Sequence, residues 1–364
     1  MASAAADLLV CKPEDRGSHC GKVRRRLFQW TMAQSMNPRI AIFAPSSTVS
    51  RDEFMRGIEL LRAHDFPCDI HPHTFATHFT YGGTDQQRLE GLSRWAWFSD
   101  IEIVMAARGG YGATRLLPML DELTAVVGVP ARKLLVGYSD LTALHAYVHQ
   151  RWGWATLHAP MPSSPGFGAN RNEWQALANC LCGRPGSLRF EHLQWLTPAP
   201  KEAIIAELVG GNLTVLAALC GTPYQVNATG RLLFIEDVGE PWYRLDRCLT
   251  QLLQSGVLKD ARGIVLGDFH NCKDDVPLVV DRENLSQKIP LRPTITQDQA
   301  LAEIFGSLGE RLGLPVAAGV PAGHGPNYWP VPLHADYRLS PDGSLKLVQW
   351  AWESADPSAS DAVP

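Results

Sequence analysis

The stretch Lys133-Leu-Leu-Val-Gly-Tyr-Ser-Asp-Leu-Thr-Ala143 decides the fold class. It begins with a short aliphatic run that is typical of a buried β-strand, and a helical pattern starts at its end. The glycine and serine between these two parts predict a sharp turn from strand to helix. A strand that leads directly into a helix is the repeating unit of a parallel sheet with helices on its faces.

The same alternation of short apolar runs and amphipathic segments precedes this stretch. The expected elements cover residues 40–44, 51–63, 101–106 and 113–123. They predict an α/β unit with a mostly parallel sheet and flanking helices, similar to flavodoxin or to class I amidotransferases. Ligands bind beyond the carboxyl ends of such strands, so we expect the glycine-rich segment Arg108-Gly-Gly-Tyr-Gly112 at the ligand-binding edge.

A second α/β unit, richer in β-structure, is expected after a shift towards proline, glycine and serine between residues 160 and 200. Its expected strands are 203–206, 232–235, 263–266, 314–318, 337–339 and 345–348, and its expected helices run from the turn Gly210-Gly-Asn212 to Leu219 and from 243 to 255. The expected division is a loosely ordered extension at 1–37, an N-terminal domain with the nucleophile at 38–165, a linker at 166–202, a C-terminal domain at 203–350 and a tail at 351–364.

The amino-acid composition gives no reason to expect a nucleic-acid or membrane partner. The chain of 364 residues is 45% hydrophobic and 19% charged, with a formal charge of -4, which gives no electrostatic reason to expect nucleic acid. The sequence shows neither an apolar window suited to a membrane span nor the pattern of a secretory signal, so we expect a cytoplasmic protein without a membrane partner. Eight cysteines form no CxxC pair, and we expect reduced thiols, with Cys220 and Cys248 buried on helices.

Ser139 is the first candidate for a catalytic residue. At a strand-to-helix turn its hydroxyl would lie at a helix N-terminus, where backbone N–H groups and the helix dipole stabilise an oxyanion. Serine is also a favoured helix N-cap, so a purely structural role explains the same position. Leu141 stands where the nucleophile elbow of α/β-hydrolases has glycine, which argues against that fold and leaves a serine mechanism open.

A serine nucleophile needs a base and an acid that orients the base. Among the twelve histidines, His324 lies between two glycines after an apolar run, and His158 is the strongest alternative because it also ends an apolar run. The acid is expected at a strand end, where the chain offers Glu236, Asp237 and Glu240. Glu236 follows the apolar run directly, although a capping or surface ion-pair role also fits an acid at that place.

Six short motifs, in order along the chain, resemble those of the LD-carboxypeptidases, also called muramoyltetrapeptide carboxypeptidases. The motifs are Arg108-Gly-Gly-Tyr-Gly112, Gly137-Tyr-Ser-Asp140, Gly211-Asn-Leu213, Ile235-Glu-Asp-Val238, Tyr243-Arg-Leu-Asp-Arg247 and Gly323-His-Gly325. Six ordered motifs are far more specific than any one of them. The resemblance extends over most of the chain and leaves only the expected extension and tail outside it.

The resemblance implies a serine peptidase in which Ser139 is the nucleophile, His324 the general base and acid, and Glu236 the residue that fixes the imidazole tautomer. It also implies an oxyanion hole formed by the N–H groups of Asp140 and Gly110. The family removes the terminal D-alanine from cytoplasmic peptidoglycan tetrapeptides during cell-wall recycling, so the implied partner is a peptidoglycan-derived peptide. It further implies a homodimer and neither a metal nor an organic cofactor, because a Ser-His-Glu system supplies its own proton shuttle.

The candidate substrate contacts are Arg108, Tyr111 and Trp242. Arg108 could bind the terminal carboxylate of the peptide or serve as a structural ion-pair partner. Some residues depart from the family pattern: Trp242, Tyr328 and Trp329 are bulky aromatics, and His334 stands where members often have glycine. These side chains either pack between the domains or reshape the leaving-group pocket.

Three other functions stay open. The microcin C immunity-type branch of the family hydrolyses aminoacyl sulfamoyl adenylates and stacks an aromatic side chain on the nucleobase, a role that Trp242 or Trp329 could fill. A muropeptide sensor would bind without cleaving, although competent residues occupy all three catalytic positions. A nucleotide-binding dehydrogenase fits less well, because Gly109-Gly-Tyr-Gly112 lacks the GxGxxG spacing.

Overall fold

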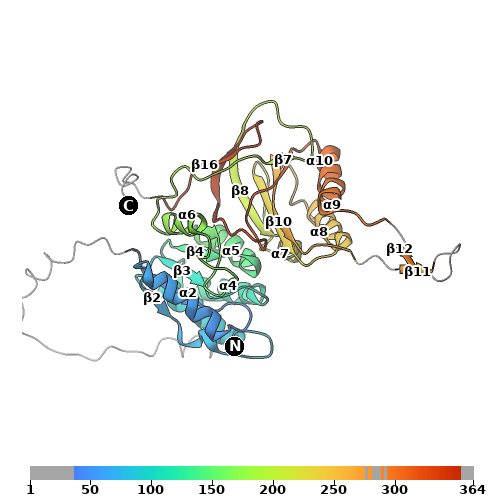
Figure 1. Ribbon diagram of the computed structural model, residues 1–364. Helices are drawn as coiled ribbons and strands as arrows, with labels where there is room; N and C mark the ends of the chain where they lie inside the picture. Colours follow the sequence, from blue (N-terminus) through green and yellow to red (C-terminus); the bar gives the residue numbers. More distant parts are fainter. Residues whose placement is uncertain (1–36, 275–277, 281–287, 291–292, 354–364) are drawn as a thin grey trace, which may run out of the picture.

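Two β-sheets form the framework of the protein (Figure 1), whose computed structural model describes residues 37–274, 278–280, 288–290 and 293–353. The strand order is β14-β5-β4-β3-β1-β2 in the first sheet and β6-β16-β15-β8-β9-β10-β13-β7 in the second. The expected extension at 1–37 lies outside the described residues except for Asn37, and so does the expected tail beyond residue 353.

The first sheet is the one that the N-terminal alternation predicts. Its parallel strands are β1 (Ile40–Phe43), β2 (Cys68–Ile70), β3 (Ile103–Ala106), β4 (Leu134–Gly137) and β5 (Ala155–His158). Nearly all residues of these strands are buried, because helices cover both faces of the sheet. The expected mostly parallel sheet with flanking helices is confirmed.

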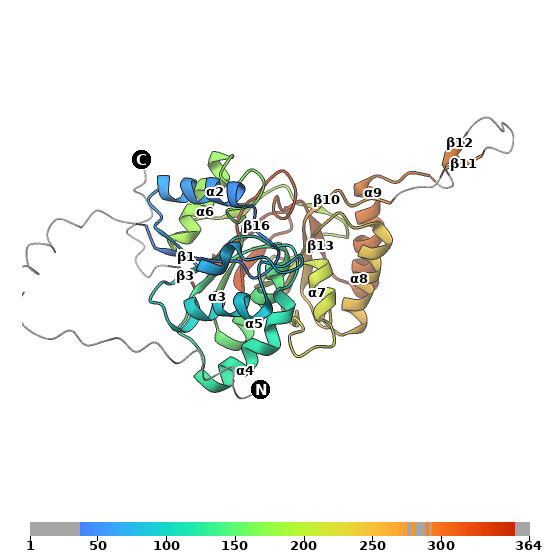
Figure 2. The same ribbon diagram turned by 90° about the horizontal axis from the view of Figure 1, so that it is seen from below.

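Helices lie on both faces of this sheet. Figure 2 shows α2 (Arg51–Ala63) and α6 (Arg171–Leu181) on one side and α3 (Asp85–Trp97), α4 (Leu117–Val127) and α5 (Thr142–Trp152) on the other. Successive residues of β1 belong alternately to the two hydrophobic cores, as the strand period requires. Short 3₁₀ helices occupy Pro72–Phe75, Ala113–Leu116 and Ser139–Leu141.

The second sheet is mixed. Its parallel strands are β8 (Ile204–Asn212), β9 (Leu232–Val238), β10 (Gly263–His270) and β13 (Val316–Ala318). Antiparallel pairing adds β15 (Ala335–Leu339), β16 (Leu345–Gln349), β6 (Arg189–Phe190) and β7 (Gln194–Trp195) at its edges. The second unit is thus richer in β-structure, as expected.

Helices of the second unit pack with this sheet in the larger hydrophobic core. They are α7 (Leu213–Leu219), α8 (Trp242–Gln254), α9 (Gln297–Leu301) and α10 (Ser307–Leu312), with a π-helical turn at Ala302–Gly306 between the last two. A separate antiparallel ribbon, β11 (Leu278–Val280) and β12 (Lys288–Pro290), projects from the body in both views (Figures 1 and 2).

The expected linker at 166–202 is part of both units. Its helix α6 buries Trp174 and Leu177 in the core of the first unit, because its apolar residues recur at helical spacing. Its short strands β6 and β7 extend the second sheet. The chain also returns to the first sheet late, since β14 (Val331–Leu333) pairs antiparallel with β5.

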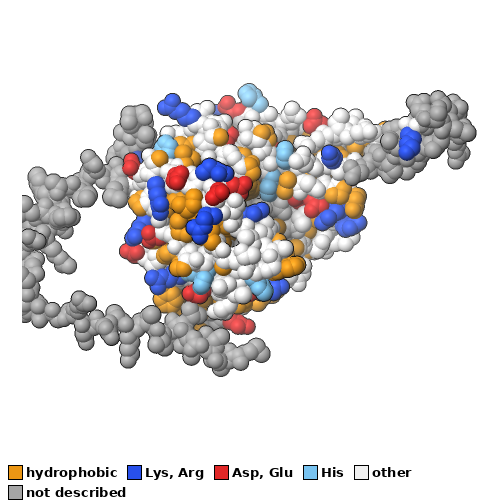
Figure 3. Space-filling model, turned by 60° about the horizontal axis from the view of Figure 1, so that its bottom comes forward, with side chains coloured by type: hydrophobic (Ala, Val, Ile, Leu, Met, Phe, Trp, Pro, Cys, Tyr) orange, Lys and Arg blue, Asp and Glu red, His pale blue; other side chains and the backbone are white. Residues whose placement is uncertain are grey.

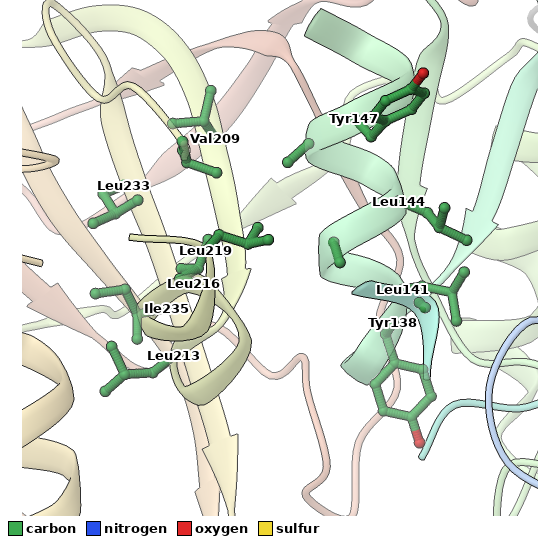
Figure 4. Packing of buried hydrophobic residues seen from close by; sticks show 14 of the residues in the cluster. Tyr138, Leu141, Leu144, Tyr147, Val209, Leu213, Leu216, Leu219, Leu233 and Ile235 are labelled. Atoms are coloured by element: carbon green, nitrogen blue, oxygen red, sulfur yellow. The ribbon is translucent and has the colours of Figure 1, made fainter. Parts of the chain in front are cut away.

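The two units share one core. Figure 4 shows Leu144 and Tyr147 on α5 and Leu213 and Leu216 on α7, all members of this cluster. Helix α5 packs against both α7 and β8. The helix that follows Ser139 is therefore fixed against the second unit.

Gly210 and Gly211 lie within β8, which continues to Asn212, instead of forming the predicted turn. Their φ values of 129° and 139° lie in a region open to glycine, so β8 stays paired with β9 as far as Asn212. A Cβ on Gly211 would lie 2.9 Å from Thr142 Cγ2, so glycine permits the close approach of α5. The Asn212 side chain accepts the Val215 N–H and caps α7, which begins where the sequence predicts.

The six described cysteines carry free thiols. Cys248 lies on α8 and Cys220 directly follows α7, but both are only half-buried, because they sit at the margin of the core. The expectation that they are buried is therefore wrong.

Positive and negative side chains are mixed on the face that Figure 3 shows. Within the described part of the chain, no helix combines the length and apolar character that a bilayer span requires.

Gly57 of α2 touches the backbone of the loop at 161–169. A Cβ at this position would lie 2.6 Å from Pro162 Cα, closer than packing allows. Glycine within a helix normally costs stability relative to alanine, but here overpacking against a fixed backbone reverses the sign.

We expect Gly57→Ala to lower the free energy of unfolding by about 1–3 kcal/mol, measured by urea denaturation. Glu59→Ala, at an exposed position of the same helix, is the matched control and should change stability by less than about 0.5 kcal/mol. A Gly57→Ala protein as stable as the wild type would contradict the close contact.

Candidate active site

Ser139 lies at the turn between β4 and the helix that follows it. Its φ of 66° is in the left-handed region that serine rarely occupies. The turn continues as a 3₁₀ helix and then as α5, so the serine begins a helical segment. The buried side chains of Tyr138 and Leu141 hold the strained backbone in place. The backbone of Ser139 is thereby fixed at the start of the helix, while its side chain forms no hydrogen bond among the described residues.

Glu236 and His324 form a hydrogen-bonded pair. Glu236 on β9 is 0% exposed, and its Oε2 accepts a hydrogen bond of 2.7 Å from Nδ1 of His324, in the loop after β13. A Cβ on Gly323 would lie 2.9 Å from Glu236 Oε2, so the residue before the histidine has to be small. The side chain of His324 is 16% exposed, so the imidazole reaches solvent while its partner does not.

Electrostatics of the pair follow from burial and charge. Burial alone would raise the pKa of Glu236, but the imidazoles of His324 and His158 outweigh it and hold this pKa at about 2. Burial lowers the pKa of His324, and the charge and hydrogen bond of Glu236 outweigh that effect, so the pKa is raised. Glu236 is therefore ionised at neutral pH, and it stabilises the imidazolium that forms when His324 accepts a proton.

Ser139 and His324 line one pocket of about 850 Å³. Its walls come from α2, residues 108–110, the loop at 161–169 and Val238 at the end of β9. Among the described residues, no hydrogen bond joins the Ser139 hydroxyl to His324. The ring of Tyr138 lies 4.7 Å from the ring of His324, so the residue before the serine contacts the imidazole directly.

Two backbone N–H groups beside Ser139 have no partner. In the described part of the chain, neither the Gly110 N–H nor the Asp140 N–H donates a hydrogen bond. Gly109 approaches so closely that its Cβ would lie 2.9 Å from Ser139 Cβ. The Asp140 carboxylate, whose pKa burial raises, accepts the Ala113 N–H at 2.8 Å and so holds the glycine-rich segment near the serine. The arrangement can bind a negatively charged oxygen.

The three predicted substrate contacts lie in different environments. Arg108 lines the pocket and donates from Nη1 to Thr48 O at 2.8 Å. Tyr111 is 53% exposed and packs on Tyr81, with no part in lining the pocket. Trp242 is 5% exposed and belongs to the core around α8. Of the three, Arg108 lines the pocket, whereas the Tyr111 ring faces another aromatic ring and the Trp242 ring is enclosed by the core. A substrate contact at Tyr111 or Trp242 stays a prediction.

The two other acids near Glu236 have their own partners. Asp237 is buried and accepts hydrogen bonds from the first turn of α7. Glu240 forms an ion pair of 2.9 Å with Arg244. Neither contacts His324, so Glu236 is the acid on the histidine.

The aromatic residues of the late segment pack against other side chains. Tyr328, Trp329 and His334 do not line the pocket. Their ring neighbours are Tyr138, Phe190 and His149, respectively. Packing rather than a reshaped pocket accounts for these departures from the family pattern.

Asp268 is a polar residue near the site that the sequence analysis missed. It lies on β10 against Gly325, the residue after His324, and burial raises its pKa to about 6. Glu236 was predicted because it is an acid at the end of an apolar run. Asp268 has a similar position near the carboxyl end of the neighbouring strand, so the same pattern could have identified it. No three described His, Cys, Asp or Glu side chains are grouped closely enough to hold a metal ion.

The sequence analysis predicted only some of the residues that line the pocket. The segment at 162–166 was expected to mark a domain crossing, whereas it lines the pocket together with Glu53 and Arg56 of α2. Nothing in the local pattern of α2 distinguishes these exposed charges from a solvated helix face. Only the folded chain places them opposite Ser139.

Comparison with known proteins gives matches over both units of the chain. Residues 40–159 match the LD-carboxypeptidase N-terminal domain, and residues 206–339 match the LD-carboxypeptidase C-terminal domain. A murein tetrapeptide carboxypeptidase of Pseudomonas aeruginosa is 32% identical over 302 residues, which are 80% of this chain and 90% of the relative. The crystal structure of a muramoyltetrapeptide carboxypeptidase from Oxalobacter formigenes has a TM-score of 0.68 at 27% identity and covers 87% of this chain and 100% of that one.

A more distant similarity leads to a second kind of relative. The microcin C7 self-immunity protein of Escherichia coli is 26% identical over 253 residues, which are 62% of this chain and 72% of that protein. The chain belongs to the LD-carboxypeptidase family.

Proposed function

We propose that the protein is a serine-type LD-carboxypeptidase that releases the terminal D-alanine from peptidoglycan tetrapeptides. The observation that carries this proposal is the 2.7 Å hydrogen bond between His324 and the buried Glu236. His324 lines the same pocket as Ser139. The 32% identical murein tetrapeptide carboxypeptidase supports the class of substrate.

In the proposed reaction, Ser139 Oγ attacks the carbonyl carbon before the terminal residue and passes its proton to Nε2 of His324. The N–H groups of Gly110 and Asp140 bind the resulting oxyanion. His324 then gives the proton to the departing amine, and a water molecule activated by the same imidazole hydrolyses the acyl-enzyme. Glu236 stays ionised throughout.

In the protein without substrate, the Ser139 side chain is not yet placed for the proposed reaction. Because no hydrogen bond joins Ser139 to His324 among the described residues, the serine side chain has to rotate towards the imidazole when substrate binds. The N–H groups of Gly110 and Asp140 need no adjustment, since within the described residues they donate no hydrogen bond.

Arg108 is the proposed anchor of the terminal carboxylate. It lines the pocket next to the oxyanion segment and forms no ion pair within the described chain, so its remaining guanidinium donors are available. Guanidinium binds carboxylate through paired hydrogen bonds, which suits a peptidase that reads a free carboxyl end. A role in cytoplasmic cell-wall recycling and a homodimeric state complete the proposal, both by family resemblance.

Hydrolysis of aminoacyl sulfamoyl adenosine is the second candidate function. The similarity to the microcin C7 self-immunity protein favours it. The enclosed position of Trp242 speaks against it, because a ring in the core cannot stack on a nucleobase.

Wild-type protein should release D-alanine from a muramoyl tetrapeptide, with EDTA present throughout, and Ser139→Ala should release none. The matched control is Ser93→Ala, a buried serine of α3 away from the pocket, which should retain full activity. Faster turnover of an aminoacyl sulfamoyl adenosine, or loss of D-alanine release in EDTA, would count against the proposal.

Arg108→Gln should raise KM for a peptide ending in free D-alanine by about 10- to 100-fold, because a charge-assisted hydrogen bond is lost. For the same peptide ending in D-alaninamide, the variant and the wild type should have similar KM values. Arg56→Gln, which removes another pocket guanidinium, serves as the control. Equal losses on both peptides would show that Arg108 has a structural role instead.

Glu236→Gln should lower kcat by about 10³- to 10⁴-fold while the fold is retained, because the imidazolium loses its counter-charge. The pKa of His324 should fall, since burial lowers it and Glu236 contributes the largest of the effects that raise it. Both effects are measured by steady-state kinetics and by NMR titration of labelled histidine. Glu240→Gln is the control, and an unchanged His324 titration in Glu236→Gln would refute the assignment.

A further inference from the structure

His158 lies between the strands that carry the two halves of the site. It is the last residue of β5, where it pairs with Gly137 on one side and with Val331 on the other. Gly137 leads into the turn of Ser139, and Val331 belongs to β14, which follows the His324 loop. The position of His158 is therefore fixed by both units.

The imidazole of His158 points at the second oxygen of Glu236. Its Nε2 lies 3.7 Å from Glu236 Oε1, and the two side chains are 2% and 0% exposed. Neither atom has a hydrogen-bond partner among the described residues. The separation exceeds hydrogen-bond length, so the contact in this state is electrostatic. A buried carboxylate oxygen without a donor is costly, and His158 is the donor within reach.

The ring of His158 is held in this direction by aromatic neighbours. Phe234 and Tyr138 pack against it in edge arrangements, with centroids 5.2 and 5.7 Å away. Tyr138 also contacts His324, so one ring braces both imidazoles. The two histidines thus approach the two oxygens of one carboxylate.

We propose that His158 is a positioning residue that donates Nε2–H to Glu236 Oε1 and so holds Glu236 Oε2 on His324. The carboxylate cannot then rotate or take up a proton without losing a hydrogen bond. This inference rests on the proposed function only in that His324 acts as the base of the serine.

The expected pH effect has a definite sign. A donor on Glu236 stabilises the ionised carboxylate, so its loss makes the Glu236–His324 pair bind a proton more tightly. The apparent pKa of the pair then rises, and activity is lost at a higher pH on the acid side. Other titratable groups face the pair from the packed elements and stay in place in the His158 variants: Asp237, Asp268 and Tyr138. His145 faces His158 and not the pair.

The test compares His158→Met with His158→Gln, two side chains of similar length of which only glutamine carries an N–H donor near the Nε2 position. The readout is the rate at which a fluorophosphonate modifies Ser139, as a function of pH, which needs no peptide substrate. We expect the acid midpoint to rise by about one pH unit in His158→Met and to stay near the wild-type value in His158→Gln.

His145→Phe is the matched control. His145 is a fully buried histidine on α5 whose ring nitrogens have no hydrogen-bond partner within the described residues, and it does not contact Glu236. The acid midpoint of Ser139 modification in His145→Phe should equal that of the wild type. The same upward shift in His145→Phe, or wild-type midpoints in both His158 variants, would overturn the proposal.

A measurement on the wild type guards against variants that fail to fold. Nitrogen NMR should show His158 protonated at Nε2, and an Nδ1-protonated tautomer would refute the donor role. Failure of the proposed function would look different: D-alanine release would be absent, while the phosphonylation of Ser139 and its dependence on His158 would persist.

Discussion

The buried charge of Glu236 is the constraint on which the site depends. A carboxylate with no solvent exposure is stable only when groups of opposite charge or hydrogen-bond donors surround it. The bond to His324 meets most of that need, and it also raises the proton affinity of the imidazole. The interaction that makes the charge tolerable in the core is thus the one that would prepare His324 for its proposed role as a base.

The shared core turns two separate sheets into one site. Ser139 belongs to the first sheet, whereas Glu236 and His324 belong to the second, so their juxtaposition depends on how the units pack. Helix α5 begins at the serine turn and packs on α7 and β8, and β14 returns to the edge of the first sheet. A chain that returns to the first sheet at β14 and leaves it again at β15 gives one half of the site little freedom to move against the other.

The local sequence pattern was sufficient to predict most of the strands and helices of the two sheets. The run that leads to Ser139, the strand that ends near Glu236 and the glycines around His324 each predicted their own turn or strand, because the signals are short-range. Elements whose residues depend on distant partners were misread or missed. The chain at Gly210-Gly211 continues a strand because β9 and α5 lie beside it, and α6 was taken as linker because its apolar stripe finds its core only in the folded molecule.

The sequence by itself predicted the class of fold, the family and a candidate triad of Ser139, Glu236 and His324, because six short motifs in order resemble those of one family. Only the tertiary structure decided which oxygen of Glu236 meets His324, that His158 reaches the other, and that Trp242 is enclosed while Arg108 lines the pocket. These relations join residues far apart in the chain. They follow from the packing of two sheets through a common core, and no local pattern encodes that packing.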